Sequence, residues 1–285
     1  MVLVTGAVGQ LGTDIVLELE KRNIKCICVD NRTEDLPSCL NLDITYEKAV
    51  YTFITEKKPQ SVIHCAAYTA VDKAEDESEE CFKVNAEGTE NIAKACKEVG
   101  AELIYISTDY VFSGESDKPY ETDAVKSPVS VYGKSKLAGE EAVLKHLDKY
   151  YIVRISWVFG EHGNNFVKTM LRLAETREEL NVVSDQIGSP TYTPDLAILL
   201  CNMTLSGKYG TYHATNEGFC SWAEFAEEIM RQSGSDCNIN PIPTERYPTK
   251  AVRPKNSRLS KKSLDEAGFA RLPTWQNALE RYLCK

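Results

Sequence analysis

Tyr132 and Lys136 are the residue types best suited to proton transfer, and they lie four positions apart in the string YGKSK. On a helix, residues i and i+4 share a face, so these two side chains would meet. A phenol with an ordinary pKa of about 10 can transfer a proton near neutral pH when an adjacent ammonium favours its phenolate. The string begins a predicted helix and follows a predicted strand that ends at Ser107, Thr108 and Asp109. This order predicts a reductase site built from a hydroxyl (Thr108), a tyrosine and a lysine.

A glycine-rich turn, TGAVGQLG, follows the first predicted strand. Gly6 would permit the tight turn out of the strand, Gly9 would let the backbone approach a pyrophosphate, and Gly12 would let the next helix pack close to the sheet. Free N–H groups and the helix dipole then favour an anion. Because the turn stands between a strand and a helix, it predicts a dinucleotide-binding site.

Asp30 ends the second predicted strand, at the place where a carboxylate hydrogen-bonds the adenosine ribose of a dinucleotide. Its alternative interpretation is a turn residue in the string DNR. Arg32 in the same string could hold a 2′-phosphate. The two charges together leave both NADH and NADPH open as the cofactor of the predicted reductase site and suggest dual use.

The elements that must position these residues alternate along the first half of the chain. Apolar and β-branched runs predict strands over 2–5, 25–29, 61–65, 102–106 and 151–155. Helical periods predict helices over 10–22, 46–57 and 131–146, and a long buried helix that starts at Cys81. This alternation predicts an α/β fold: a Rossmann-like, doubly wound parallel sheet with helices on both faces.

The second half of the chain is less regular. Its pattern predicts loops near 160–165 and 184–194, a helix near 222–232 and a proline-rich stretch over 241–254. We expect residues 1–155 to form mainly the dinucleotide-binding domain, which includes the catalytic tyrosine and lysine. Residues 156–285 would form mainly a smaller C-terminal substrate-binding part, packed against the first.

Composition excludes several classes of protein. The 285 residues are 42% hydrophobic and 26% charged, as in ordinary soluble proteins, and the longest apolar run, 196–201, is far too short to span a membrane. The net charge of −9 argues against a protein that coats nucleic acid. The N-terminus lacks the pattern of a signal peptide, so we expect a cytoplasmic protein whose ten cysteines are free thiols. The four histidines lack zinc-ligand spacing.

Longer strings resemble one enzyme superfamily. The TGxxGxxG turn, the string NAEGTEN (85–91) and the YxxxK pair are similar to the extended short-chain dehydrogenases/reductases. More narrowly, five strings resemble the dTDP-4-dehydrorhamnose reductase family: AYTAVDKAE (67–75), STDYVF (107–112), RISWVF (154–159), GNNF (163–166) and RPKNS (253–257). They reach from the first strand nearly to Leu259.

The resemblance implies an activity: NAD(P)H reduces the C4 keto group of dTDP-4-dehydro-L-rhamnose to give dTDP-L-rhamnose, in the biosynthesis of nucleotide sugars for cell-surface polysaccharides. Tyr132 would donate the proton, Lys136 would hold the nicotinamide ribose and tune Tyr132, and Thr108 would orient the carbonyl. With the residues of the turn, the expected cofactor-binding set is Gly6, Gly9, Gln10, Leu11, Gly12, Asp30, Arg32, Asp43, Ile44, Ala67, Tyr68, Thr69, Tyr132 and Lys136. The expected substrate-binding set is Thr108, Asp109, Trp157, Arg253 and Asn256.

The residues themselves agree with parts of this assignment. Arg253 lies among Lys250, Lys255 and Arg258, a local positive charge suited to a diphosphate; a solvated charged face is the alternative. Trp157 would contact the substrate or belong to the core. Some family members hold Mg²⁺ at a dimer interface through acidic residues, but this chain has Asp14 and Pro194 at the matching positions. We therefore expect no metal, and the sequence leaves a homo-oligomer open.

Three rival functions differ from reduction. A nucleotide-sugar dehydratase of this fold needs a second carboxylate directly after the first, whereas Asp109 is followed by Tyr110. An epimerase usually carries GFIG in the first turn, where this chain has GQLG. A non-catalytic regulatory subunit with a reductase fold is the third possibility, and the intact Thr108, Tyr132 and Lys136 argue against it.

Overall fold

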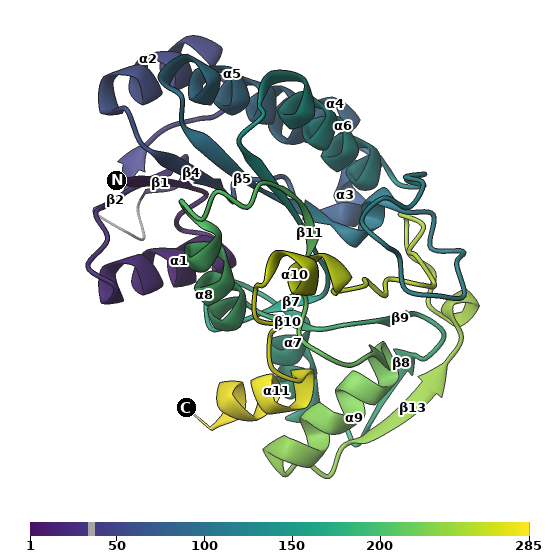
Figure 1. The fold of residues 1–285 in the computed structure, drawn as a ribbon. Helices are drawn as coiled ribbons and strands as arrows, with labels where there is room; N and C mark the ends of the chain where they lie inside the picture. The colour runs from purple at the N-terminus through teal and green to yellow at the C-terminus, as the bar shows by residue number, and fades with distance from the viewer. Residues whose placement is uncertain (34–37, 285) are drawn as a thin grey trace.

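A seven-stranded parallel sheet organises the N-terminal part of the computed structural model, which describes residues 1–33 and 38–284 (Figure 1). Within this range the strand order is β11-β6-β5-β4-β1-β2-β3, and all neighbours are parallel. The strands are β1 (Val2–Thr5), β2 (Cys26–Asp30), β3 (Leu40–Asn41), β4 (Ser61–His64), β5 (Glu102–Thr108), β6 (Tyr150–Ile155) and β11 (Gly210–His213). The order reverses between β1 and β4, which confirms the predicted doubly wound α/β fold.

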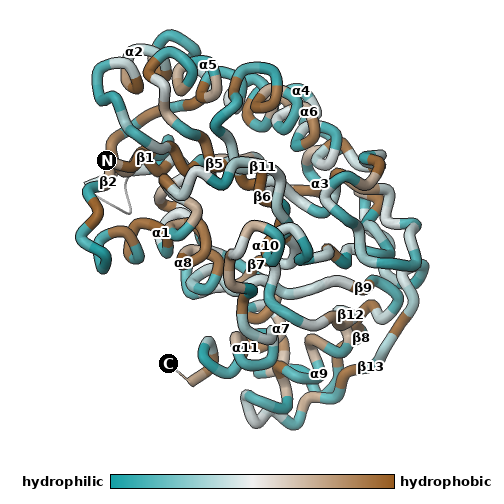
Figure 2. Tube along the Cα trace, viewed as in Figure 1, coloured by the Kyte–Doolittle hydropathy of each residue, from teal (hydrophilic) through white to brown (hydrophobic). Residues whose placement is uncertain are grey.

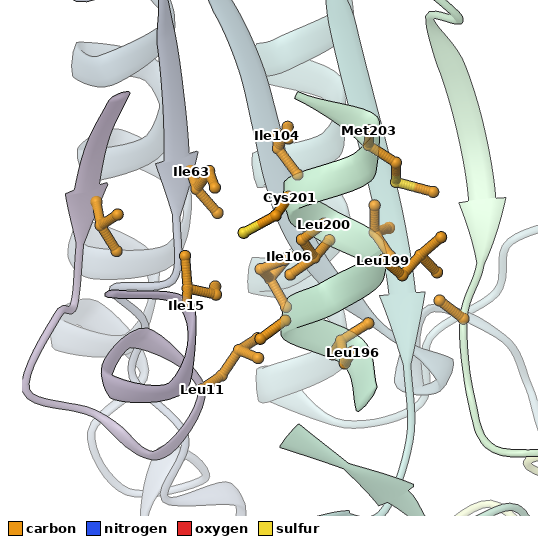
Figure 3. Packing of buried hydrophobic residues seen from close by; sticks show 14 of the residues in the cluster. Leu11, Ile15, Ile63, Ile104, Ile106, Leu196, Leu199, Leu200, Cys201 and Met203 are labelled. Atoms are coloured by element: carbon orange, nitrogen blue, oxygen red, sulfur yellow. The ribbon is translucent and has the colours of Figure 1, made fainter. Parts of the chain in front are cut away.

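Helices cover both faces of this sheet (Figure 1). One face is covered by α2 (Glu47–Lys57), α5 (Thr89–Val99) and α6 (Val131–His146), the other by α1 (Gln10–Lys21) and α8 (Thr193–Met203). On the second face, Ile15 of α1 and Leu200 of α8 pack with Ile63 and Ile104 of the sheet (Figure 3). α8 is hydrophobic over most of its length (Figure 2). Because both faces are covered, the central strands are apolar on both sides.

The long helix predicted from Cys81 is present, but its backbone changes along the way. α4 (Ser78–Phe82) passes through a π-helical turn, η1 (Lys83–Gly88), into α5. The predicted apolar face is buried at Gly88, Ile92 and Cys96. A π turn widens the helix to i→i+5 hydrogen bonding, which the spacing of apolar residues does not reveal. The short α3 (Val71–Ala74) precedes it.

Smaller sheets and helices form the C-terminal part, in the lower half of Figure 1. Its elements are β7 (Val158–Phe159), α7 (Phe166–Ala174), β8 (Glu179–Val183), β9 (Ile187–Gly188), β10 (Thr191–Tyr192), β12 (Cys220–Ser221), α9 (Trp222–Ser233), β13 (Asn238–Ile242), α10 (Lys262–Ala267) and α11 (Trp275–Leu283). Helix α9 confirms the helix predicted near 222–232. It begins with a capping box, in which Ser221 and Glu224 bond each other's backbone N–H.

Two elements from beyond residue 155 belong to the N-terminal part. Strand β11 pairs with β6 in the seven-stranded sheet, and helix α8 packs against α1. The loop predicted over 184–194 is wrong in part, because the segment holds β9, β10 and the start of α8. Pro194 fits there because N–H groups of the first helical turn have no partner within the helix. No helix in the described ranges is long and apolar enough to cross a lipid bilayer.

Candidate active site

The carboxyl ends of β1, β4 and β5 bring the predicted site residues together beside the reversal of strand order. Loops diverge at such a point and leave a crevice for a ligand. The glycine turn follows β1, the segment 67–69 follows β4, and Thr108 is the last residue of β5. Strand β5 extends two residues beyond the range 102–106 that its apolar residues predict, and Asp109 begins a 3₁₀ turn, η2 (Asp109–Val111).

The glycine turn has room only for glycine at two of its positions. Gly6 has a φ of +66°, and a Cβ there would lie 2.5 Å from the backbone nitrogen of Ala66. A Cβ at Gly12 would overlap the carbonyl oxygen of Gly6. Gly9 is the N-cap of α1, so the first N–H groups of that helix point out of the turn. This cradle fits the pyrophosphate of a dinucleotide.

The two residues after Gly9 have side chains with other contacts. Gln10 accepts a hydrogen bond at 3.0 Å from Asn165, and Leu11 is buried in the core beneath the sheet. Only their backbone N–H groups would therefore face an anion at the helix N-terminus. Their place in the cofactor-binding set stays a prediction.

Asp30 is buried at the end of β2 and ties the glycine turn to the next loop. Its carboxylate accepts hydrogen bonds from the backbone N–H of Val8 (3.1 Å) and of Arg32 (3.0 Å). The Arg32 guanidinium, 70% exposed, lies 3.8 Å from the same carboxylate. An exposed guanidinium can turn towards a phosphate without leaving its aspartate unpaired, because the two backbone N–H groups remain.

Asp43 and Ile44 are held in place next to this loop. The Asp43 carboxylate accepts from the backbone N–H and hydroxyl of Thr45, at 2.9 and 2.8 Å. Asn91 of α5 donates to the Ile44 carbonyl at 3.0 Å. These contacts hold the buried apolar side chain of Ile44 next to the carboxyl ends of β2 and β3, where Asp30 lies.

Asn85 is a site residue that the sequence reasoning did not single out. It lies buried in the π turn, accepts from the backbone N–H of Tyr68 (2.8 Å) and donates to its carbonyl (3.0 Å). The same amide nitrogen is 3.0 Å from the hydroxyl of Ser135 on α6. Asn85 thus ties the 67–69 segment to the helix that carries Tyr132 and Lys136. The string NAEGTEN contained it, but nothing local indicates the π turn that aims it.

Tyr132 meets Thr108 as predicted from the order of the chain. Helix α6 is capped by Ser130, whose hydroxyl accepts from the backbone N–H of Gly133 at 3.1 Å, and Tyr132 lies in its first turn. Its phenol hydrogen-bonds Thr108 and packs edge-on against Tyr110, with 5.5 Å between ring centroids. Exclusion of water raises the pKa of Tyr132 well above its ordinary value. The phenol is therefore protonated and can act as an acid.

Lys136 is buried one turn further along α6. Its Nζ donates to the carbonyl of Ile106 (2.7 Å) and lies 4.1 Å from the centroid of the Tyr105 ring. Burial lowers the pKa of Lys136 to about 7, and the carboxylate of Glu140 opposes that effect. The pKa of Tyr132 responds to burial, to the hydroxyl of Thr108 and to neighbouring side chains such as Asp109, and tuning of the tyrosine by the lysine stays a prediction.

Asp109 is a buried carboxyl directly behind Thr108. It accepts a hydrogen bond from the Thr108 hydroxyl at 3.0 Å, and the hydroxyl of Ser257 is a second partner. Burial raises the pKa of Asp109 to about 6 despite these bonds. The Asp109 carboxyl is therefore a buried titratable group close to Tyr132.

Trp157 lies between β6 and β7 in an unusual backbone conformation. Its φ of +49° is strained for a residue with a side chain, and its ring stacks on Trp222 with 3.7 Å between centroids. Strained backbone of this kind clusters at functional sites. Trp157 is only partly buried and packs against the core of the C-terminal part, so its contact with the substrate stays a prediction.

Arg253 comes from the far end of the chain. Its guanidinium donates to Asp72 (2.5 Å) and to the hydroxyl of Tyr110 (3.2 Å). It also lines a cavity of about 280 Å³ with Trp222 and Gln186. The neighbouring basic residues are engaged elsewhere: Lys250 pairs with Asp76, Lys255 with Asp185 and Glu245, and Arg258 with Asn256.

Asn256 is buried within its own loop. Its side-chain amide donates to the Lys118 carbonyl at 2.8 Å and accepts from Arg258 at 2.7 Å. These bonds make it a residue that shapes the loop, and direct contact with a ligand stays a prediction. Among residues 1–33 and 38–284, no three His, Cys, Asp or Glu side chains gather where they could hold a metal ion. All ten cysteines lie in these ranges as free thiols.

Comparison with known proteins supports the same assignment. The family model of the RmlD substrate binding domain matches residues 1–285. The chain is 42% identical to the spore coat polysaccharide biosynthesis protein SpsK of Bacillus subtilis, over 99% of this chain and 96% of that protein. It is 41% identical to dTDP-4-dehydrorhamnose reductase of Aggregatibacter actinomycetemcomitans, over 98% and 96% of the two chains.

A solved structure agrees over the whole length. The crystal structure of dTDP-4-dehydrorhamnose reductase from Bacillus anthracis, in complex with NADP, matches with a TM-score of 0.94 at 43% identity, and covers 99% of this chain and 98% of that one. The resemblance noted in the sequence strings is thereby confirmed over nearly every residue. The chain belongs to the RmlD substrate-binding-domain family, the family of the dTDP-4-dehydrorhamnose reductases.

Proposed function

We propose that this protein reduces the C4 keto group of dTDP-4-dehydro-L-rhamnose with NAD(P)H and releases dTDP-L-rhamnose. The observation that carries the proposal is the contact of a protonated Tyr132 with Thr108 beside a dinucleotide cradle. Membership of the family supports it. The nicotinamide supplies a hydride when bound, so the protein must supply only one proton, orientation and exclusion of water.

Tyr132 delivers that proton to the developing alkoxide at C4. Its raised pKa keeps the phenol protonated, and the hydroxyl of Thr108 orients the carbonyl towards it. Lys136 holds the nicotinamide ribose through its ammonium. Without substrate the Thr108 hydroxyl donates its one proton to Asp109 at 3.0 Å, and it turns from that carboxylate to the C4 carbonyl when the sugar binds.

The cofactor lies along the carboxyl ends of β1, β2 and β4. The N–H groups around Gly9, Gln10 and Leu11 receive the pyrophosphate, and the cradle needs Gly6 and Gly12 to exist at all. The adenosine end lies at Asp30, Asp43 and Ile44. The segment Ala67, Tyr68 and Thr69, fixed by Asn85, lines the nicotinamide half.

Both NADH and NADPH are accepted in this proposal. The relative from Bacillus anthracis was crystallised with NADP, and Arg32 is exposed enough to reach a 2′-phosphate. Asp30 favours a free ribose hydroxyl and repels that phosphate. Neither cofactor is preferred by more than about 1–2 kcal/mol, the contribution of one charge-assisted hydrogen bond less the opposing repulsion. A more than thousandfold preference in kcat/KM would show that one of the two side chains does not reach the cofactor.

The nucleotide-sugar enters from the side of Trp157 and Arg253. The guanidinium of Arg253 exchanges Asp72 for the diphosphate, since charge-assisted bonds to either anion are of similar strength. The cavity that Arg253 lines accommodates the nucleotide end, and Asn256 shapes the loop around it. Residues 156–285 thus contribute mainly to the substrate, and residues 1–155 mainly to the cofactor and to catalysis.

Oxidation of NADPH in the presence of dTDP-4-dehydro-L-rhamnose, followed by the absorbance of the reduced nicotinamide, tests the proposal. Stoichiometric loss of NADPH with formation of dTDP-L-rhamnose supports it. Product formation without consumption of reduced cofactor would favour an epimerase or dehydratase. Tight binding of the sugar with no turnover by either cofactor would favour a regulatory subunit.

A further inference from the structure

A buried ion pair lies directly beneath the candidate catalytic residues. Glu140 of α6 and Arg154 of β6 are each 1% exposed. The guanidinium donates two hydrogen bonds to the carboxylate, both of 2.8 Å. The hydroxyl of Ser107 on β5 donates a third to the same carboxylate at 2.5 Å. The catalytic chemistry proposed above uses none of these three side chains.

Arg154 is fully satisfied where it lies. It also donates to the carbonyl of Thr122 at 2.9 Å, lies 3.3 Å from the ring of His213, and stacks over the Phe112 ring at 5.1 Å. Burial and the Arg154 charge lower the pKa of His213 to about 3, so this imidazole is neutral. The positive charge of Arg154 therefore faces a single carboxylate, that of Glu140, within its hydrogen-bond shell.

The register between α6 and β5 explains why this position matters. Glu140 stands one helical turn after Lys136, which stands one turn after Tyr132, so all three share a face. On β5, consecutive residues receive them: the Ile106 carbonyl binds Lys136, and Ser107 binds Glu140. Thr108, the next residue, binds Tyr132. A slip of α6 against β5 would break all three contacts together.

Stability alone does not account for the pair. Two charged groups lose hydration free energy on burial, and their mutual attraction offsets this loss only in part. A protein with well-packed apolar residues of the same volume in their place is often as stable or more stable. Lys136, in contrast, gains from the carboxylate. The titratable groups that face Lys136 are His64 on β4, Cys65 directly after β4, and Cys81 on α4. Glu140 faces it from the same helix, α6. The thiols and the imidazole are neutral, because burial raises the pKa of the cysteines and lowers that of His64 to about 3.

We propose that Glu140, clamped by Arg154 and Ser107, is a positioning residue that keeps Lys136 in its ammonium form and holds Tyr132 and Lys136 in register with Thr108. The role rests on the proposed reductase function. It needs no contact between Glu140 and the substrate or cofactor. Arg154 keeps the carboxylate from turning away through its two hydrogen bonds.

Three variants separate this role from simple structural support. Glu140→Gln keeps the size and removes the charge. Glu140→Gln combined with Arg154→Met removes both charges, so no buried ion is left unpaired. Glu141→Gln is the matched control, because Glu141 is the next residue on the same helix and is exposed.

The first readout uses cofactor-free protein. The proton uptake of Lys136 is obtained from urea unfolding across pH, as the difference between each protein and the same protein carrying Lys136→Met. Glu140→Gln should move the titration of Lys136 down by about one pH unit or more, since an opposite charge nearby shifts a pKa by about 1–3. Glu141→Gln should leave it unchanged.

The second readout is the pH profile of kcat for sugar reduction. In Glu140→Gln the high-pH limb of this profile should shift to lower pH. The double variant should show the same shift, while its unfolding midpoint recovers towards that of the parent. An unchanged Lys136 titration in Glu140→Gln would overturn the proposal, and so would a double variant with both parental stability and the parental pH profile. If the parent enzyme fails to reduce the sugar, the proposed function fails, while the unfolding experiment still decides the role of Glu140.

Discussion

Replacement of Lys136 by methionine should make the protein's stability respond differently to pH. The side chain is 3% exposed, and burial lowers its pKa from the ordinary 10.5 to about 7. In the unfolded chain the pKa of Lys136 has its ordinary value of 10.5. Between pH 7 and 10.5 the unfolded chain therefore binds one more proton than the folded protein, and the free energy of unfolding rises with pH across that window.

The size of the effect follows from this difference. The slope is about 1.4 kcal/mol per pH unit, so Lys136 contributes a gain of about 2–3 kcal/mol between pH 7 and pH 9. Lys136→Met abolishes this gain. It also leaves the Ile106 carbonyl without its 2.7 Å donor, a cost of about 1–3 kcal/mol that is the same at every pH. The pH-dependent part is therefore separable from the constant part.

Urea unfolding of the parent and of Lys136→Met, at several pH values from 6 to 9, measures the difference directly. We expect the parent to gain about 2–3 kcal/mol on the variant as pH rises from 7 to 9. Lys134→Met is the control, because Lys134 lies on the same helix with its side chain exposed. A parent–variant difference that stays constant within about 0.5 kcal/mol would refute the reasoning, since it would mean that folding leaves the pKa of Lys136 unchanged.

Three further outcomes test the site. Tyr132→Phe should lower kcat by about 10²–10⁴ with NADPH affinity nearly unchanged, because the lost proton is transferred only in the transition state; a variant with more than about a tenth of the parent kcat would point to another acid. Gly12→Ala should cost about 1–3 kcal/mol in unfolding free energy and abolish NADPH binding by calorimetry, because its Cβ would overlap the Gly6 carbonyl. Arg32→Ala should raise the KM for NADPH about tenfold and leave that for NADH unchanged, the loss expected for one charge-assisted bond; equal changes for both cofactors would contradict its contact with a 2′-phosphate.

Local sequence patterns were enough to predict the glycine turn and the Tyr132–Lys136 pair. The glycine turn is one continuous string whose backbone demands lie within seven residues, and the structure shows the crowding at Gly6 and Gly12 that requires glycine. Tyr132 and Lys136 share a helix face by periodicity alone. The predicted helix over 131–146 matches α6 at both ends, since Ser130 caps its start.

Contacts between distant segments were outside the reach of such patterns. Asn85 acts through a π turn and Tyr68 lies 17 residues away from it, while Arg253 meets Asp72 across 181 residues. The sheet is completed by β11, from beyond the predicted division of the chain. Several residues of the expected cofactor and substrate sets also have side chains engaged within the protein, among them Gln10, Leu11, Asn256 and Arg253.

The sequence by itself determined the α/β class, the dinucleotide turn and the Tyr–Lys pair, because each depends on the spacing of residues along one element. Only the tertiary structure decided how Lys136 is charged and held. Burial lowers the pKa of Lys136, and the carboxylate of Glu140, which Arg154 of β6 holds in place, opposes that effect. Burial and the pairing of charges are properties of the packed chain, and no run of neighbouring residues specifies them.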